Sequence, residues 1–190
     1  MGSGSVVKLT PNTPLAGFAK DWPEFSIKET YKGELISLAV KNGEDKAFAA
    51  AFKKAYGKAP PGPNERAEVK DGFVFWTGQG QYMLMLAGEN IHANTDAIAK
   101  LGGTAYATLQ TDGWASLVLN GDRVFDVLER FVPLDLRSAK NTYAARTMAH
   151  HIAVIVLKYS DTDIQLLTPR SSAQSFLDGL VHTADLHLIS

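Results

Sequence analysis

Apolar residues recur along the chain with two spacings, and together these predict alternating strands and helices. A spacing of four through Phe48, Phe52 and Tyr56 is typical of an amphipathic helix, which we predict over 44–56. Uninterrupted apolar runs of strand length indicate β-structure instead. They are LISLAV at 35–40, YMLML at 82–86 and IAVIVL at 152–157. The pattern therefore indicates mixed α and β structure.

Turn residues between strand-like segments predict three antiparallel hairpins. Their strands are 73–78 with 82–86, around GQGQ; 105–110 with 115–120, around Thr111, Asp112 and Gly113; and 151–159 with 164–168. Capping residues and apolar spacing predict three further helices. These begin at Asn94 or Thr95, at Asp122, and at Ser171 or Ser172.

The order of the predicted elements repeats once along the chain. A strand, helix, hairpin, helix and strand are followed by the same series without its last strand. SLAVKNG at 37–43 and SLVLNG at 116–121 each precede an amphipathic helix, which supports a repeated architecture. The sequence therefore predicts an α+β fold of two ferredoxin-like βαββα(β) repeats with mainly antiparallel sheets. The repeats are placed at 31–110 and 111–190.

Residues 1–30 precede the first repeat as an N-terminal arm. Its first five residues, MGSGS, resemble a flexible linker, and the mixed composition of the rest predicts neither strand nor helix. Two aromatic residues in the arm, Trp22 and Phe25, either pack on their own domain or form part of a partner interface. Trp114 likewise either covers the core of its own domain or anchors a partner interface. Arg170, beside Pro169 at a predicted helix start, binds an anion, forms a surface ion pair or contacts a partner.

Composition excludes several classes of protein. The 190 residues are 45% hydrophobic and 21% charged, which is typical of a globular chain. Nineteen basic and twenty acidic residues give a net charge of −1, so no overall field attracts nucleic acid or an anionic membrane. The chain has no cysteine, which excludes disulfides and thiolate chemistry. No apolar run reaches the ~20 residues of a membrane-spanning helix, and we expect a soluble, cytoplasmic protein.

A search for catalytic and metal-binding motifs finds none. No glycine loop fits a phosphate site, and no GxSxG element is present. His150 and His151 would face opposite sides of a strand, and His182 and His187 lie five residues apart on a predicted helix. Asp161 and Asp163 fall at a hairpin tip, where a solvated turn explains them. We therefore expect no catalytic, cofactor-binding or metal-binding residue on this chain.

The segment ERFVPLDLRSAK at 129–140 contains a carboxylate, Asp135, between two leucines. Such an acid could be a catalytic base, a ligand anchor or a structural cap. Pro133 disfavours helix at Val132 and ends the preceding helix there. Leu134 and Leu136 can then point one way and Asp135 the other. We expect Asp135 to accept backbone hydrogen bonds in the following turn.

Several segments, in order, resemble the gamma subunit of heterotetrameric sarcosine oxidase. The longest, YATLQTDGWASLVLNGDRVFDVLERFVPLDLRSAK at 106–140, is similar to that family's strand, aspartate-glycine turn, strand, helix and PLDL element. FVFWTGQGQYMLML at 73–86 and IQLLTPRSSAQSFLDGL at 164–180 are similar to its upstream tryptophan-containing segment and its closing strand and helix. The resemblance covers roughly residues 70–182.

The resemblance implies a fold related to the folate-binding half of the glycine-cleavage aminomethyltransferase. It also implies a non-catalytic subunit of a flavoenzyme that oxidatively demethylates sarcosine to glycine, with one-carbon transfer to tetrahydrofolate. FAD, FMN, NAD and tetrahydrofolate would be bound by larger flavoprotein subunits. Because its sheets would be only half covered, we expect the isolated chain to self-associate.

Three alternatives remain open at this point. The first is the corresponding subunit of an N-methylglutamate dehydrogenase. The second is an autonomous folate-binding, aminomethyltransferase-like protein, which would need a pterin-anchoring carboxylate; Asp135 and Asp112 are the candidates. The third is a stand-alone structural domain in which Trp22 and Trp114 pack internally.

Overall fold

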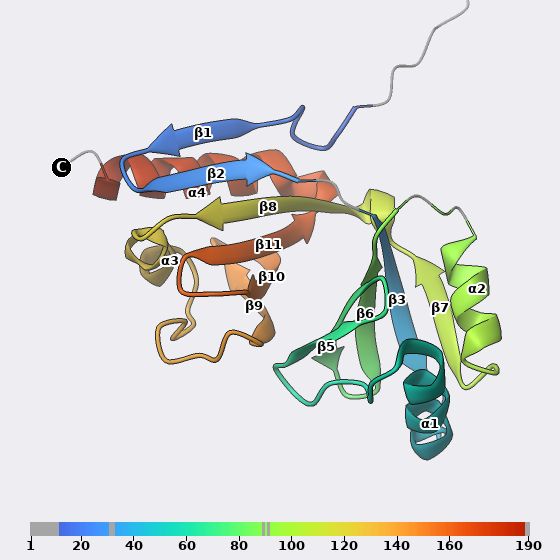
Figure 1. The fold of residues 1–190 in the computed structure, drawn as a ribbon. Coiled ribbons are helices and arrows are strands. Elements are labelled where there is room, and N and C mark those ends of the chain that lie inside the picture. The colour runs from blue at the N-terminus through green and yellow to red at the C-terminus, as the bar shows by residue number, and fades with distance from the viewer. Residues whose placement is uncertain (1–11, 31–32, 89, 91, 189–190) are drawn as a thin grey trace, which may run out of the picture.

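Two antiparallel sheets lie at the centre of the protein, and each is covered by two helices on its outer face (Figure 1). The computed structural model describes residues 12–30, 33–88, 90 and 92–188. The five-stranded sheet has the order β4 (Arg66–Val69), β5 (Gly72–Gly78), β6 (Gln81–Leu86), β3 (Glu34–Val40) and β7 (Ala105–Leu109). Its helices are α1 (Asp45–Tyr56) and α2 (Ala93–Lys100).

The six-stranded sheet contains the remaining strands. Their order is β1 (Ala19–Trp22), β2 (Phe25–Glu29), β8 (Trp114–Asn120), β11 (Asp163–Pro169), β10 (Ile152–Lys158) and β9 (Ala144–Ala149). The helices on its outer face are α3 (Val124–Phe131) and α4 (Ala173–Leu188), and the latter follows a short 3₁₀ turn at Arg170–Ser172. Every strand pairing in both sheets is antiparallel.

Each sheet contains the ferredoxin-like strand order that the sequence predicts. In the first, β3, α1, β5, β6, α2 and β7 follow one another along the chain, and β3 lies between β6 and β7. In the second, β8, α3, β10, β11 and α4 repeat this series, with β8 beside β11. The predicted α+β fold of two such repeats is confirmed.

The N-terminal arm supplies the strand that the second repeat lacks. β2 pairs with β8 on the side where a fourth strand belongs, and β1 extends the sheet as a hairpin with β2. The turn of this hairpin sits against Gly121, whose φ is +132°. A Cβ at Gly121 would lie 2.1 Å from the carbonyl oxygen of Glu24, so only glycine permits this approach. The arm therefore forms two strands that its mixed composition did not predict.

The predicted hairpin of 105–110 with 115–120 is wrong. β7 pairs with β3 in one sheet, while β8 pairs with β11 and β2 in the other. The residues between them form a 3₁₀ turn at Thr111–Gly113 that carries the chain from one sheet to the other. Thr111 fixes this crossover, because its hydroxyl accepts from the Leu35 N–H and donates to the buried carboxylate of Glu34.

Three predicted helix starts and one predicted strand also differ in detail. α3 begins at Val124 with Arg123 as its N-cap, so Asp122 precedes the helix. α2 begins at Ala93, with His92 as its N-cap and no side-chain capping bond, so neither Asn94 nor Thr95 caps it. Ser171 and Ser172 lie in the 3₁₀ turn that precedes α4. His150 and His151 form the tight turn of the β9–β10 hairpin and both have positive φ, so they are not part of a strand.

The two sheets pack against each other through their inner faces. The layer between them contains seven buried apolar residues and completes a helix–sheet–sheet–helix arrangement. They are Leu35, Phe75, Met83, Ala144, Ile155, Leu157 and Leu167. The sheets also meet along one edge, where Ala144 donates to the Asn64 carbonyl and Arg66 to the Thr142 carbonyl through backbone N–H groups.

Two buried cations fix the segment that follows α3. The Lys158 side chain is 1% exposed, and its ammonium donates to the carbonyls of Leu136 and Ala139 at 2.9 and 2.7 Å. The same ammonium pairs with Asp161 at 2.8 Å. Arg66 donates through Nε to the Lys158 carbonyl. Because both cations donate to carbonyl groups, they hold this irregular segment in place instead of destabilising the interior.

Candidate functional site

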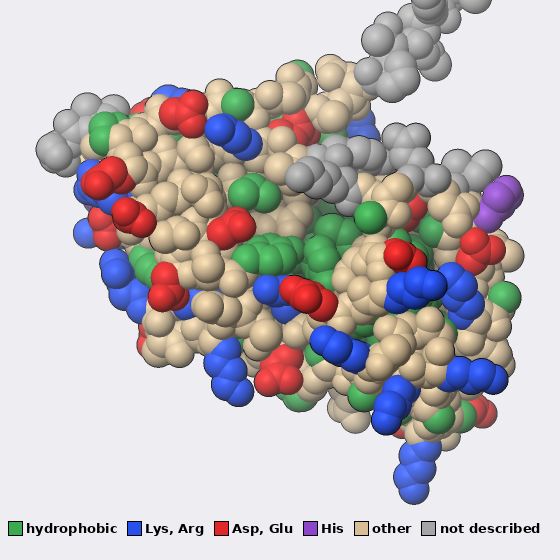
Figure 2. Space-filling view, in the orientation of Figure 1, with side chains coloured by type: hydrophobic (Ala, Val, Ile, Leu, Met, Phe, Trp, Pro, Cys, Tyr) green, Lys and Arg blue, Asp and Glu red, His purple; other side chains and the backbone are tan. Residues whose placement is uncertain are grey.

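A groove opens at one end of the layer between the two sheets. Its volume is about 750 Å³, which lies in the range of small-molecule binding sites. Phe73 and Met85 line it from the five-stranded sheet, and Val118 and Tyr159 line it from the six-stranded sheet and its margin. Figure 2 shows hydrophobic side chains gathered in the hollow between the two halves of the molecule. The groove is therefore mainly apolar.

Small residues keep the rim of this groove open. Gly33, Gly72, Ala87 and Gly88 all line it. At Gly72 a Cβ would lie 2.0 Å from the carbonyl oxygen of Met85, so the chain approaches its neighbouring strand too closely for any side chain.

A chain of hydrogen bonds crosses the floor of the groove along the six-stranded sheet. The Tyr159 hydroxyl donates to Gln165 Oε1 at 2.7 Å, and Gln165 Nε2 donates to Ser116 Oγ at 2.7 Å. Ser116 Oγ lies 3.0 Å from the hydroxyl of Thr30, which follows β2. These bonds satisfy the polar atoms of the floor and connect the N-terminal arm to the rest of the sheet.

Tyr159 is held in a fixed orientation by two neighbouring side chains. Its ring meets Phe73 edge-on, with centroids 5.9 Å apart, and the Arg66 guanidinium lies 4.1 Å from its centroid. Burial raises the pKa of Tyr159 well above its ordinary value, against the opposing effect of Arg66. The phenol therefore stays protonated at neutral pH and acts as a hydrogen-bond donor.

Few side chains in the groove are suited to acid–base or metal chemistry. Asp163, at the start of β11, is the one carboxylate among the residues that line it. Within the described ranges, no group of three or more His, Cys, Asp or Glu residues is placed to hold a metal ion. The groove is suited to a largely apolar ligand with a few hydrogen-bonding atoms.

The structure places Trp22 and Phe25 in the interior of this chain. Their exposed fractions are 9% and 2%, and their ring centroids lie 5.5 Å apart in the core beneath α4. The indole N–H of Trp22 donates to Asp185 at 2.7 Å. Both rings therefore pack on their own domain, and a role for them at a partner interface stays a prediction.

Trp114 and Arg170 lie elsewhere in the structure. Trp114 is partly buried and packs against the apolar layer between the sheets, and its role in a partner interface stays a prediction. Arg170 is exposed, and its guanidinium donates to the Asn12 carbonyl at 3.3 Å. Its role in a partner interface stays a prediction.

The two carboxylates proposed as ligand anchors both lie outside the groove. Asp135 is exposed and accepts from the Ser138 hydroxyl at 2.6 Å and the Ser138 N–H at 3.2 Å. These hydrogen bonds lower its pKa below the ordinary value. Leu134 and Leu136 pack into the core, so Asp135 is the turn cap expected from the sequence. Asp112 is exposed in the 3₁₀ turn between the sheets.

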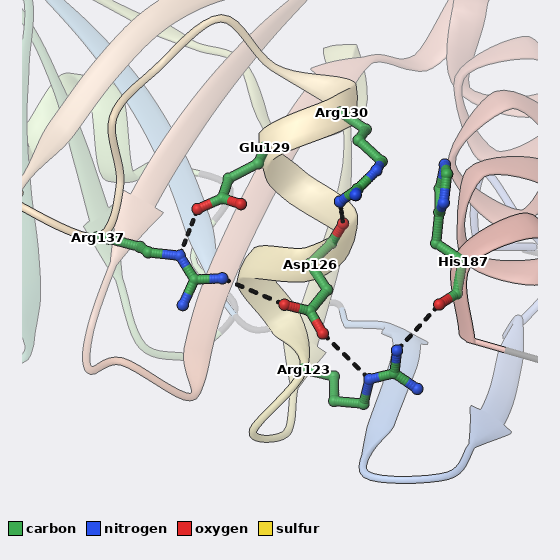
Figure 3. Close-up of polar contacts among 6 residues, drawn as sticks. All are labelled: Arg123, Asp126, Glu129, Arg130, Arg137 and His187. Carbon is green, nitrogen blue, oxygen red and sulfur yellow. Dashed lines mark hydrogen bonds and ion pairs between the residues drawn. The ribbon is translucent and has the colours of Figure 1, made fainter. Parts of the chain in front are cut away.

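The sequence reasoning missed a chain of ion pairs on the outer surface of α3 (Figure 3). Asp126 pairs with Arg123 and Arg137, each at 3.1 Å, and Arg137 also pairs with Glu129. Arg123 in turn donates to the carbonyl of His187 at 2.9 Å, near the end of α4. The i,i+3 spacing of Arg123 and Asp126 was the one sequence signal for this network. The pairs connect α3 to both α4 and the following loop.

Together the fold and the groove define a duplicated ferredoxin-like α+β protein with a ligand-sized hollow between its halves. Comparison with solved structures identifies a particular protein with a similar fold. A chain of heterotetrameric sarcosine oxidase from Corynebacterium sp. U-96 superposes with a TM-score of 0.79 at 19% identity. The match covers 93% of this chain and 96% of that one. The predicted resemblance to sarcosine oxidase is thus confirmed at the level of the fold.

Aminomethyltransferases share the same fold. The glycine cleavage system aminomethyltransferase T from Bartonella henselae matches with a TM-score of 0.56 and 14% identity, over 80% of this chain and 44% of that chain. An aminomethyltransferase from Deinococcus deserti is 26% identical over 125 residues, which is 63% of this chain. The match covers 35% of the Deinococcus protein, so this chain corresponds to about a third of it.

No protein-family model matches the chain. In the part of the chain that the structure describes, no helix combines the length and the apolar character needed to cross a membrane.

Proposed function

We propose that this chain is a non-catalytic accessory subunit, of the gamma type, in a sarcosine-oxidase-like flavoenzyme. One observation supports this most strongly: the fold matches a chain of the heterotetrameric enzyme over nearly the full length of both chains. The aminomethyltransferase, by contrast, is more than twice as long as the part that matches. A relationship to a subunit of about the same length is simpler than a relationship to part of a longer enzyme.

In this proposal the reaction takes place on larger partner subunits. These would bind FAD, FMN, NAD and tetrahydrofolate, oxidatively demethylate sarcosine to glycine, and pass the one-carbon unit to the folate. The present chain would contribute a folded surface to the assembly. Its exposed Arg170 and the ion-paired surface of α3 offer polar contacts suited to a subunit boundary.

Reconstitution tests this role. The flavoprotein subunits are expressed with and without this chain, and both assembly and amine oxidation are measured. We expect assembly to require the chain, while the turnover per flavin of whatever assembles is unchanged by substitutions in the groove. A complex that assembles and turns over equally well without the chain would contradict the proposal. Comparing sarcosine with N-methylglutamate as substrates separates the two related enzyme classes.

A second candidate is an autonomous folate-binding protein, and the groove favours it. Phe73 and Met85 give it an apolar wall, and Asp163 supplies a carboxylate for the polar edge of a ring. Titration of the isolated chain with tetrahydrofolate tests this. Saturable binding that is lost in Phe73→Ala and kept in Phe18→Ala, a substitution outside the groove, would support it. An absence of saturable binding would leave the accessory-subunit proposal alone.

A further inference from the structure

A second cleft lies between the two sheets, apart from the apolar groove, and its chemistry is different. Its volume is about 280 Å³, and it is lined by strands β3, β5 and β6 on one side and β9 and β10 on the other. Arg146 is the one charged residue among those that line it, and no acidic residue does so. The cleft is therefore small, polar and positively charged.

Strand register places the Arg146 side chain on the wall of this cleft. Arg146 on β9 pairs directly with Ile155 on β10, and paired residues in antiparallel strands project from the same face. Ile155 belongs to the apolar layer between the sheets, so Arg146 also projects from the inner face. It lies where that layer ends, and its side chain is exposed.

Arg146 differs from the other arginines of the chain in having no acceptor. The other five each donate to a carboxylate or a backbone carbonyl. Within the described residues, Arg146 makes no hydrogen bond and no ion pair. An arginine side chain offers five donors in a planar fork that matches a carboxylate. The residues that the structure describes therefore supply no counter-charge for it in the cleft.

The opposite wall supplies neutral hydrogen-bonding groups. Ser37 pairs with Met83, a residue of the apolar layer, and therefore projects from the same inner face. Gln81 lies two residues before Met83 on β6 and shares that face. In the described part of the chain, the side chains of Ser37, Gln81 and Gln110 have no hydrogen-bond partner. This contrasts with the groove floor, where each polar side chain is paired.

We propose that this cleft binds a small carboxylate, with the Arg146 guanidinium as its counter-charge. Ser37, Gln81 and Gln110 then bond the carboxylate or the rest of the ligand from the opposite wall. The volume restricts the ligand to a small organic acid, because the cleft is smaller than the ~300–1,000 Å³ of pockets that hold drug-sized ligands. A positive cleft without acidic neighbours also attracts such anions from solution. The site is independent of the proposed subunit role.

Isothermal titration of the full chain with acetate, succinate and inorganic phosphate tests the site, at constant ionic strength set by chloride. We expect saturable binding of acetate or succinate, with phosphate weaker. Arg146→Gln should weaken carboxylate binding about tenfold or more, since a hydrogen bond to a charged group contributes that much. Arg130→Gln is the matched control, because Arg130 is exposed on α3 and should leave binding unchanged.

Trp114 lines the same cleft and gives a second readout. Carboxylate binding should change tryptophan emission in the native chain and not in Trp114→Phe, which retains Trp22 and Trp76. Three results would overturn the proposal: no saturable carboxylate binding, equal binding in Arg146→Gln, or a preference for phosphate. If Arg146→Gln weakens association with a flavoprotein subunit but small carboxylates do not bind, the arginine serves a protein partner and the small-molecule site is wrong.

Discussion

The indole N–H of Trp22 donates to the Asp185 carboxylate at 2.7 Å and connects strand β1 to helix α4, near the two ends of the described chain. Lys20 donates to the same carboxylate at 2.8 Å, and its ammonium lies 4.6 Å from the centre of the Trp22 ring. These three residues fasten the N-terminal hairpin over the helix. The second repeat thus depends on residues from both ends of the sequence for its fourth strand.

Trp22→Phe should destabilise the protein by about 1–2 kcal/mol, because it keeps a ring in the core but removes a hydrogen bond to a charged group. Urea unfolding measures this loss. Trp76→Phe on β5 is the matched control, since the Trp76 indole has no hydrogen bond within the described residues. Equal losses in the two variants would show that the bond to Asp185 adds nothing beyond ring burial.

The same contact predicts a pH dependence. Hydrogen bonds from Lys20 and Trp22 lower the pKa of Asp185 below its ordinary value of 3.8. A carboxyl with a depressed pKa in the folded state contributes stability that is present above the ordinary pKa and is lost as pH falls through the folded-state pKa. We therefore expect Asp185→Asn to be less stable than the native chain at neutral pH. The difference should shrink below pH 3.8, and a difference independent of pH would contradict this explanation.

Lys158→Met should destabilise the protein by about 2–4 kcal/mol. The substitution retains the apolar stem but leaves the buried carbonyl of Leu136 and the partly buried carbonyl of Ala139 without their donor, and a buried unsatisfied acceptor costs about 1–3 kcal/mol. Lys140→Met is the control, because that side chain is 82% exposed and its pairing with Glu65 is loose. Thermal unfolding compares the two, and similar small losses would show that the loop does not depend on the buried ammonium.

His151→Gly should stabilise the protein by about 0.5–1 kcal/mol. His151 has a φ of +68° in the β9–β10 turn, where a side chain carries a steric cost that glycine avoids. His151→Ala retains the Cβ and should give no such gain. Replacement of His150 is a poorer test, because its ring lies 5.0 Å from that of Phe131 and would lose this contact. A gain with alanine equal to that with glycine would refute the backbone explanation.

Residue spacing was sufficient to predict most of the fold. The spacing of Phe48, Phe52 and Tyr56 identified α1, and the apolar run at 152–157 identified β10. These segments are decided by local periodicity, which a sequence displays directly. The stop imposed by Pro133 and the capping role of Asp135 are equally local, and both were predictable.

The features that were missed depend on contacts between distant segments. Thr111, Asp112 and Gly113 form a turn of hairpin type by composition, yet β7 pairs with β3 in one sheet and β8 pairs with β11 and β2 in the other. Strand β2 was not predicted for the same reason, because its strand conformation depends on pairing with the open edge of β8. The groove and the cleft arise where two sheets meet, and no short motif encodes that juxtaposition.

The polar cleft is another feature that the sequence did not predict. Arg146 stands in AARTMA, a segment without a motif, and only the pairing with Ile155 shows which face it occupies. Its lack of an acceptor becomes visible once the partners of the other arginines are known. Unpaired donors near a cleft are therefore a structural signal that composition cannot supply.

The most direct test of the central claim is affinity purification of this chain from its native organism, followed by flavin absorbance and native mass spectrometry. The account predicts that the chain emerges in fixed stoichiometry with larger subunits that carry flavin and oxidise an N-methyl amino acid. A chain that emerges alone, with no flavoprotein attached and no amine oxidation in the purified fraction, would contradict the proposed role as an accessory subunit.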